Sequence, residues 1–197
     1  MLRSLRARVR ESATPKGVVK VLSSHVRNAT TGRCTAPLLL TIDNVSDAYE
    51  CETRTQHPLF VSDMYVRLRT VEGCDLSVVG LGHEEGEEEY VLTSDTVPTQ
   101  QRKGYNALLR AVAVMVAHVL RVPLRSDVAN AWSAYSLLKD YQTTGVRRDG
   151  TRETLDRLSR EEAAARKSLY RTLYVRPTVA NLDFATRLFA DATVRCA

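Results

Sequence analysis

The sequence predicts an α/β protein of the α+β kind, in which a central, mostly antiparallel sheet is flanked by helices and carries a helical extension at each end. Three observations predict this class. Residues 59–97 contain three segments with strand-like patterns, separated by turn signals. Residues 107–120 are then apolar on nearly every face, and helical patterns occur before residue 30 and after residue 150. We expect a basic N-terminal helical extension over 1–35, a core over 36–150 and a C-terminal helical extension over 151–197.

The first half of the chain supplies most of the expected sheet. Apolar residues at helical spacing in 16–29 predict an amphipathic helix, whereas 44–56 has only weak helical character. Glu72-Gly73 and the polar run 83–89 are turn signals that predict an antiparallel meander. The strands expected here cover 36–43, 59–71, 75–82 and 90–97.

The second half is expected to be mainly helical. The apolar segment 107–120 is too short to span a bilayer, which takes about 20 residues, so we expect a buried helix. Asp156 with Arg160, and Glu162 with Arg166, have the i, i+4 spacing of a charged helix face and predict one long helix over 151–174. The remaining expectations are a strand over 122–128, an Asp149-Gly150 turn, and helices over 130–141 and 181–193.

The net charge of +5 is distributed unevenly along the chain. Residues 1–33 hold eight basic residues and one acidic residue, 34–100 hold three and thirteen, and 101–197 hold seventeen and nine. This pattern suits an anionic and a cationic ligand on different faces, or an unevenly charged solvated surface. The four cysteines lack the spacing of a zinc site, so we expect reduced thiols and no metal: Cys34, Cys51, Cys74 and Cys196.

The first twelve residues combine Leu2, Leu5 and Val9 with four arginines and a single acid, Glu11. This composition is typical of a transit peptide and equally of a basic amphipathic helix that binds an acidic partner. We expect an interaction arm that contacts protein partners and lies outside the core. The expected location is intracellular and cytoplasmic, with mitochondrial and virion-associated locations left open, and no membrane span is expected.

A polar loop between the last meander strand and the buried helix carries the chemistry. Its backbone N–H groups would point outward at a helix N-terminus, Gly104 would allow close approach of a ligand, and Arg102 and Lys103 add full charges. This combination predicts a phosphate-binding loop. The loop is neither a P-loop nor a dinucleotide fingerprint, because GxxxxGK[ST] and GxGxxG are absent.

The loop resembles the acyl-CoA-binding motif Q/R-x-x-G-x-G/A of the GNAT superfamily of N-acetyltransferases. Leu124 to Asn130 is similar to the next strand of that family and the Asn-led helix after it, so the resemblance covers about 36–145. Asn106 departs from the motif, where the family has Gly or Ala. The resemblance implies that an acyl-CoA, with acetyl-CoA as co-substrate, is bound by Val97, Gln101, Arg102, Lys103, Gly104, Tyr105, Asn106 and Asn130.

The resemblance also implies a mechanism in which an amine, on a small molecule or a protein, attacks the thioester directly. Strand 90–97 would pair with the pantetheine arm, and a backbone N–H there would stabilise the oxyanion. Glu89 and then Glu88 are the candidate bases, although a solvated hairpin tip is the simpler explanation of the acidic run. Tyr135 is a candidate for the catalytic tyrosine, but it does not occupy the family's usual step.

Two functions from different classes remain open at this point. One is an acyl-CoA-dependent N-acyltransferase, which the Gln101-x-x-Gly104 spacing favours. The other is a catalytically silent protein of the same fold that serves as a structural or assembly subunit of a large complex or virion. Asn106, the displaced tyrosine and the basic extensions favour the second.

Overall fold

The computed structural model describes residues 2–29, 38–44, 64–83, 87–96, 98–100, 104–128 and 131–195. Within them, eight strands form one sheet in the order β1-β2-β3-β4-β5-β8-β6-β7. All neighbouring strands are antiparallel except β4 and β5, which are parallel. The predicted class, an α+β protein with a mostly antiparallel sheet flanked by helices, is therefore confirmed.

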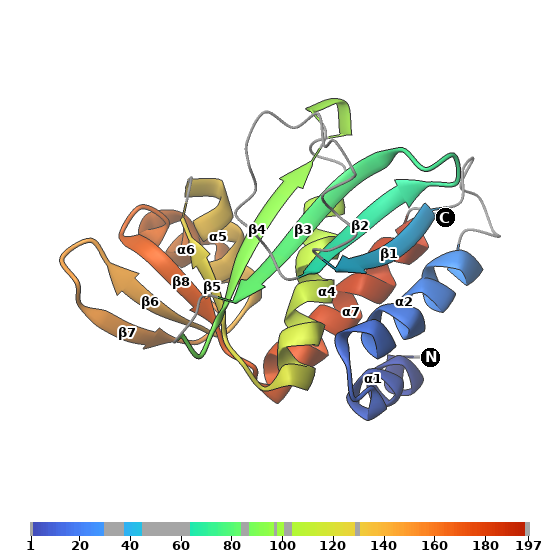
Figure 1. Cartoon of the computed structure of the whole chain (residues 1–197). Helices are drawn as coiled ribbons and strands as arrows, with labels where there is room; N and C mark the ends of the chain where they lie inside the picture. Colours follow the sequence, from blue (N-terminus) through green and yellow to red (C-terminus); the bar gives the residue numbers. More distant parts are fainter. Residues whose placement is uncertain are drawn as a thin grey trace.

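The strands β2, β3 and β4 form the predicted meander, and β1 pairs with β2 at its edge (Figure 1). Their bounds are β1 Leu38–Asn44, β2 Met64–Thr70, β3 Asp75–His83 and β4 Tyr90–Thr96. Gly73 has a φ of 85° in the β2–β3 turn, a conformation that glycine adopts without steric cost. The segment 44–56 lies outside the described residues apart from Asn44, which ends β1.

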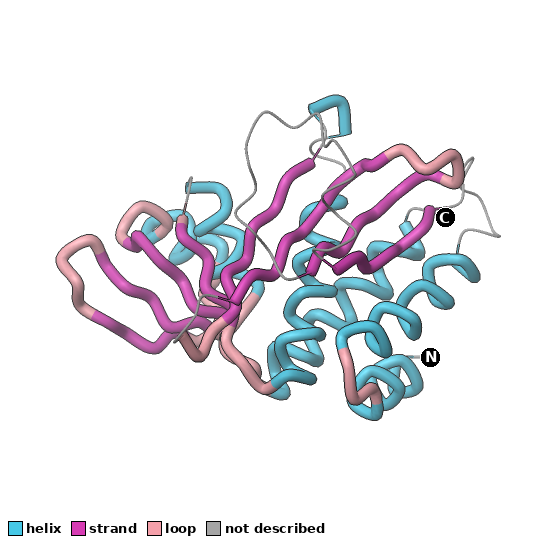
Figure 2. Tube along the Cα trace, viewed as in Figure 1, coloured by secondary structure: helices cyan, strands magenta, loops and turns pink. Residues whose placement is uncertain are grey.

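Helices pack along one side of this meander (Figure 2). They are α1 Leu2–Glu11, α2 Pro15–Ala29, α4 Tyr105–Leu120 and α7 Val179–Arg195, and the short 3-10 helix η1 Pro98–Gln100 precedes α4. As the apolar run predicts, α4 is buried almost throughout: Leu108 to Ala117 are all inaccessible or nearly so. It packs against β2, β3 and β4 on one side and against α7 and α2 on the other. None of the helices in the described part of the chain is long and apolar enough to cross a membrane.

The predicted helix over 151–174 is wrong. That segment forms β7 Arg152–Leu155, α6 Arg160–Arg166 and β8 Tyr170–Val175, and both strands pair with β6 Thr143–Arg147. Together with β5 Leu124–Asp127, they extend the sheet, and α5 Ala131–Asp140 and α6 lie beside them (Figure 1). The helical part of the C-terminal extension is thus limited to α6 and α7, while the boundaries at 35 and 150 stay predictions.

The expectation that the first residues lie outside the core is also wrong. Leu5 and Val9 are 4% and 0% exposed and belong to the same apolar cluster as α4 and α7. On the polar side of α1, Arg6 pairs with Asp183 of α7, with Nε and Oδ1 2.7 Å apart. Hence α1 is a docked helix on which Arg8 and Arg10 are exposed.

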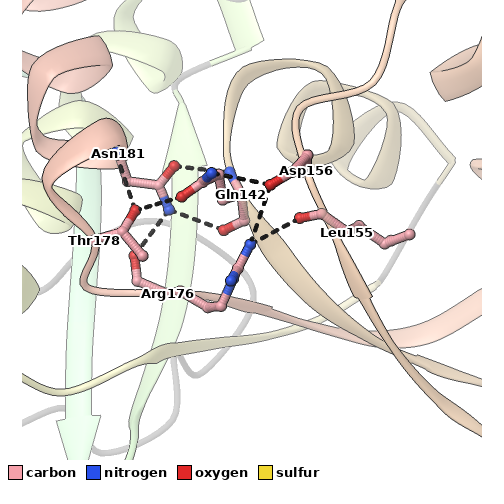
Figure 3. A network of polar contacts seen from close by, with 6 residues as sticks. All are labelled: Gln142, Leu155, Asp156, Arg176, Thr178 and Asn181. Carbon is pink, nitrogen blue, oxygen red and sulfur yellow. Dashed lines mark hydrogen bonds and ion pairs between the residues drawn. The ribbon is translucent and has the colours of Figure 1, made fainter.

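A polar network fixes the start of α7 against the α5–β6 connection (Figure 3). Thr178 caps α7, because its Oγ1 accepts the Asn181 N–H at 3.2 Å and donates to Gln142 Oε1 at 2.8 Å. Arg176 donates to the carbonyl of Leu155 at 3.1 Å, and Gln142 Nε2 donates to Asp156 at 3.0 Å. This network ties α7, which packs on α4, to the β6–β7 part of the sheet.

Candidate functional site

The strands β4 and β5 separate soon after they meet. They pair only at Tyr90 with Leu124 and at Val91 with Arg125, and the Tyr90 N–H donates to the carbonyl of Pro123 at 3.1 Å. Beyond Val91, β4 runs on to Thr96 without another β5 partner in the described strands, and Figure 1 shows the two diverging. Within the described part of the chain, the β5-facing edge of β4 from Leu92 to Asp95 therefore has no neighbouring strand, which leaves main-chain groups there for a ligand in extended conformation.

The helix α4 begins beyond the carboxyl end of β4. Gly104, at φ 85°, precedes its first residue, and no side chain caps the helix. The Leu108 N–H is the donor to the Gly104 carbonyl at 3.0 Å, so the N–H groups of Asn106 and Ala107 point out of the helix without an acceptor among the described residues. A Cβ at Gly104 would meet nothing within 4 Å. Helix dipole, outward N–H groups and open space combine here as in anion-binding helix termini.

The side chain of Asn106 joins this helix terminus to β4. Its Nδ2 donates to Ser94 Oγ at 3.2 Å, and its Oδ1 accepts from Arg110 Nη2 at 3.5 Å. The residue that departs from the family motif is thus turned toward the sheet and the helix interior. We conclude that its side-chain amide is held by two partners.

Arg110 brings a buried positive charge close to the α4 N-terminus. It is 8% exposed, and its Nε has no hydrogen-bond partner in the described structure. Burial lowers the pKa of Arg110, which nearby Tyr141 and Asp140 at the end of α5 partly offset. The guanidinium lies one turn after Asn106, so its field adds to that of the helix dipole.

The predicted phosphate loop is described only in part. Gly104, Tyr105 and Asn106 occupy the N-cap and first turn of α4, as expected. The other predicted acyl-CoA ligands, namely Val97, Gln101, Arg102, Lys103 and Asn130, lie outside the described residues.

The two candidate bases lie at the opposite end of β4 from the α4 N-terminus. Glu88 is exposed and Glu89 half-buried, in a bend just before Tyr90. The seven residues of β4 span about 23 Å at roughly 3.3 Å per residue. Glu89 is therefore beside the point where β4 and β5 meet, and a ligand lying along β4 would connect it to Gly104.

Tyr135 lies on α5 with an aromatic and a basic neighbour. Its ring packs edge-on against Trp132, with centroids 6.1 Å apart, and Lys139 Nζ is 5.8 Å from its centroid. None of its contacts within the described structure joins it to Glu88, Glu89 or Gly104. Its catalytic role stays a prediction.

Sequence reasoning missed one group of residues that the sheet brings together. Arg125, Arg152 and Arg171 come from β5, β7 and β8 and line one cavity of about 360 Å3. Their separations in sequence carry no motif, and the excess of basic residues after residue 100 was the available signal. Only the strand order β5-β8-β6-β7 places them side by side.

The described residues hold no group of three or more His, Cys, Asp and Glu that could bind a metal ion. Cys74 is an exposed free thiol, and Cys34, Cys51 and Cys196 lie outside the described residues. In comparisons with known proteins, no protein-family model matches the chain and no curated protein matches its sequence.

Proposed function

We propose that the chain binds an acyl-CoA between β4 and the N-terminus of α4 and transfers the acyl group to an amine. The observation that carries this proposal is the divergence of β4 and β5 after two residue pairs, directly before a helix that starts at an uncapped glycine with φ 85°. An extended arm can pair with the unpartnered edge of β4, while a diphosphate accepts hydrogen bonds from the N–H groups of α4. The resemblance to the GNAT superfamily assigns the same roles to these segments.

In this proposal the pantetheine arm runs from α4 along β4 toward the junction of β4 and β5. The amine nitrogen attacks the thioester carbonyl carbon there, forming a C–N bond. A main-chain N–H of β4 stabilises the oxyanion, and the C–S bond then breaks to release the CoA thiolate. Before the attack, Glu89 takes one proton from the acceptor ammonium and so gives the free amine. After the C–N bond forms, the nitrogen loses a second proton to the solvent, and the thiolate takes up a proton from the solvent. Acetyl-CoA is the expected co-substrate, and no metal is required.

The alternative is a protein of this architecture that has lost catalysis and serves as a structural or assembly subunit. The position of Tyr135 favours it, because the ring contacts described for Tyr135, with Trp132 and Lys139 of α5, do not join it to Glu88, Glu89 or Gly104. The exposed arginines of α1 would then supply an interaction surface for acidic partners.

Two measurements separate these functions. Calorimetric titration with acetyl-CoA reports binding, and release of the free thiol in the presence of an amine panel reports transfer. Saturable binding with amine-dependent thiol release supports the transferase. Binding without release under any amine supports a silent acyl-CoA-binding protein, and no binding at millimolar acetyl-CoA contradicts the proposal.

A further inference from the structure

The cavity missed by sequence reasoning lies on the face of β5, β8 and β6 that is turned away from the main apolar core. Val146, which also lines the cavity, is buried but is not part of that core. Leu173 and Val175 of β8 are buried in the core, whereas Thr172 and Tyr174 alternate with them and line the cavity. Its volume, about 360 Å3, lies within the usual range for small-molecule sites.

The cavity is strongly basic. Arg125, Arg152 and Arg171 line it, and no acidic residue occurs among its described lining residues. Asp127 reaches Arg125 from the side, with Oδ2 3.1 Å from Nη2, and also accepts from Thr172 Oγ1 at 3.0 Å. Neither Arg152 nor Arg171 forms an ion pair with a described residue, and the Arg152 guanidinium is held 5.6 Å from the centre of the Tyr174 ring. Asp127 already offsets the charge of Arg125, so the two charges that repel one another across the cavity without an acidic partner among the described residues are those of Arg152 and Arg171. An anionic group bound between them would relieve that repulsion.

One residue, Arg125, belongs both to this cavity and to the junction of β4 and β5. It lines the cavity and is also the β5 residue that pairs with Val91 of β4. Paired residues of adjacent strands point to the same face, so Val91, Arg125 and Tyr174 share one face of the sheet. The acyl-transfer position of the proposed mechanism therefore lies one strand from Arg125 of β5, two strands from Arg171 of β8 and four strands from Arg152 of β7.

We infer that Arg125, Arg152 and Arg171 bind an anionic group, a carboxylate or a phosphate, carried by the amine that accepts the acyl group. The inference deepens the proposed function and rests on it for the identity of the ligand as the acceptor. Anion binding by the cavity stands independently of acyl transfer. A planar guanidinium donates two parallel hydrogen bonds to either oxyanion, so both groups fit the same chemistry.

Anion binding is tested first, without acetyl-CoA. Phosphoethanolamine and 4-aminobutyrate are titrated calorimetrically at low salt, each against a match that lacks the anionic group, ethanolamine or 4-aminobutanamide. We expect the member with the anionic group in at least one pair to bind, and Arg152→Gln and Arg171→Gln each to weaken that binding about tenfold or more. Arg148→Gln, at an exposed position of the same β6–β7 hairpin, is the matched control and should leave binding within about twofold. Failure of both anions to bind at millimolar concentration, or an equal loss in Arg148→Gln, overturns the inference.

The acceptor role is tested by thiol release from acetyl-CoA with the same four amines. We expect the member of a pair that carries the anionic group to have a KM at least tenfold lower than its match without that group, and this preference to vanish in Arg152→Gln and Arg171→Gln but persist in Arg148→Gln. A preference for the amines without the anionic group contradicts the assignment of the ligand as acceptor. If anions bind in the cavity but no amine releases thiol, the proposed transferase fails while the anion site stands.

Discussion

The side chain of Asn181 takes the place of a strand partner for Gln142. Its Oδ1 accepts the Gln142 N–H at 2.7 Å, and its Nδ2 donates to the Gln142 carbonyl at 2.8 Å. The same Nδ2 donates to the carbonyl of Arg176 at 2.8 Å. Because Gln142 connects α5 to β6 and Asn181 lies in the first turn of α7, one buried amide holds the two parts of the sheet in register with the helical layer (Figure 3).

Replacing Asn181 by Ala is therefore expected to lower the free energy of unfolding by about 2–4 kcal/mol, since it leaves buried backbone groups without partners. Gln142→Ala is the matched control, because it removes side-chain bonds to Asp156 and Thr178 but keeps the backbone pair with Asn181. It should cost about 1 kcal/mol or less. Urea unfolding, monitored by circular dichroism, measures the free energy of unfolding of both variants. Equal losses in the two variants would show that the Asn181 side-chain amide does not make the larger contribution to stability.

Acid should weaken the link between β7, α6 and β8. Glu153 accepts from Tyr170 Oη and Arg147 Nε, both at 2.7 Å, and pairs with Arg166. The Tyr170 hydrogen bond and the two arginines lower the pKa of Glu153 from 4.5 to about 2. A carboxyl whose pKa is lowered by folding stabilises the native state above its unfolded pKa and loses that effect as the pH falls. We expect this contribution to be lost between pH 4.5 and about pH 2.

The measurement is the Tm of wild type and Glu153→Gln as a function of pH. The wild type should be the more stable above pH 4.5, and the two curves should converge toward pH 2. Glu161→Gln, an exposed carboxylate on α6, controls for the charge change. A difference between wild type and Glu153→Gln that does not depend on pH would rule out the ion-pair explanation.

The N-terminal helix should contribute to stability as part of the core. Leu5→Ala is expected to cost about 2–4 kcal/mol, because the side chain is 4% exposed and its removal leaves a cavity against α7 and α2. Arg10→Ala, on the exposed side of α1, should change stability by about 0.5 kcal/mol or less. Chemical denaturation of both variants gives the comparison. Equal free energies of unfolding for Leu5→Ala and wild type would instead support the sequence-based prediction that α1 lies outside the core.

Local patterns predicted most of the elements, because they are determined by neighbours in sequence. The alternation of apolar and polar residues and the turn at Gly73 predicted β2 and β3, and the continuous apolar run predicted α4. The charge pairs in 151–174 led to the wrong prediction of a long helix, because charged residues at i, i+4 spacing can also form contacts with residues far away in sequence. Arg166 pairs with Glu153 of β7, and Asp156 accepts from Gln142. Glu162 instead closes a capping box with Ser159, which marks a helix start in the middle of the predicted helix.

The residues of the site that belong to one loop motif could be predicted from the sequence. The residues that come together only when the sheet forms could not. Gly104 and Asn106 were located from sequence because glycine and the following helix are adjacent in the chain. Arg110 was not predicted, since a single arginine within an apolar helix gives no sign that it is buried near the helix N-terminus. The burial of the apolar side of α1 was also not predicted, because it depends on packing against α7, which lies about 170 residues away in sequence.

Glu89 is the expected general base, so Glu89→Gln should reduce turnover by a factor of about 100 to 10,000 while acetyl-CoA affinity stays nearly unchanged. Glu88→Gln is the second candidate. Glu87→Gln is the matched control, because Glu87 is exposed and one residue further from the β4–β5 junction. Steady-state thiol release and calorimetry give the two quantities. Full turnover in both Glu89→Gln and Glu88→Gln would place the base elsewhere.

The binding of acetyl-CoA to Gly104→Asp and Gly73→Asp tests the central claim most directly. Both glycines have φ 85°, and a Cβ at either meets nothing within 4 Å, so the two substitutions carry a similar backbone cost. Only Gly104 adjoins the N-terminus of α4, where a carboxylate would repel the diphosphate. We predict that Gly104→Asp raises the Kd for acetyl-CoA at least tenfold while Gly73→Asp leaves it within about twofold. Equal Kd values for the two variants and the wild type would contradict the account.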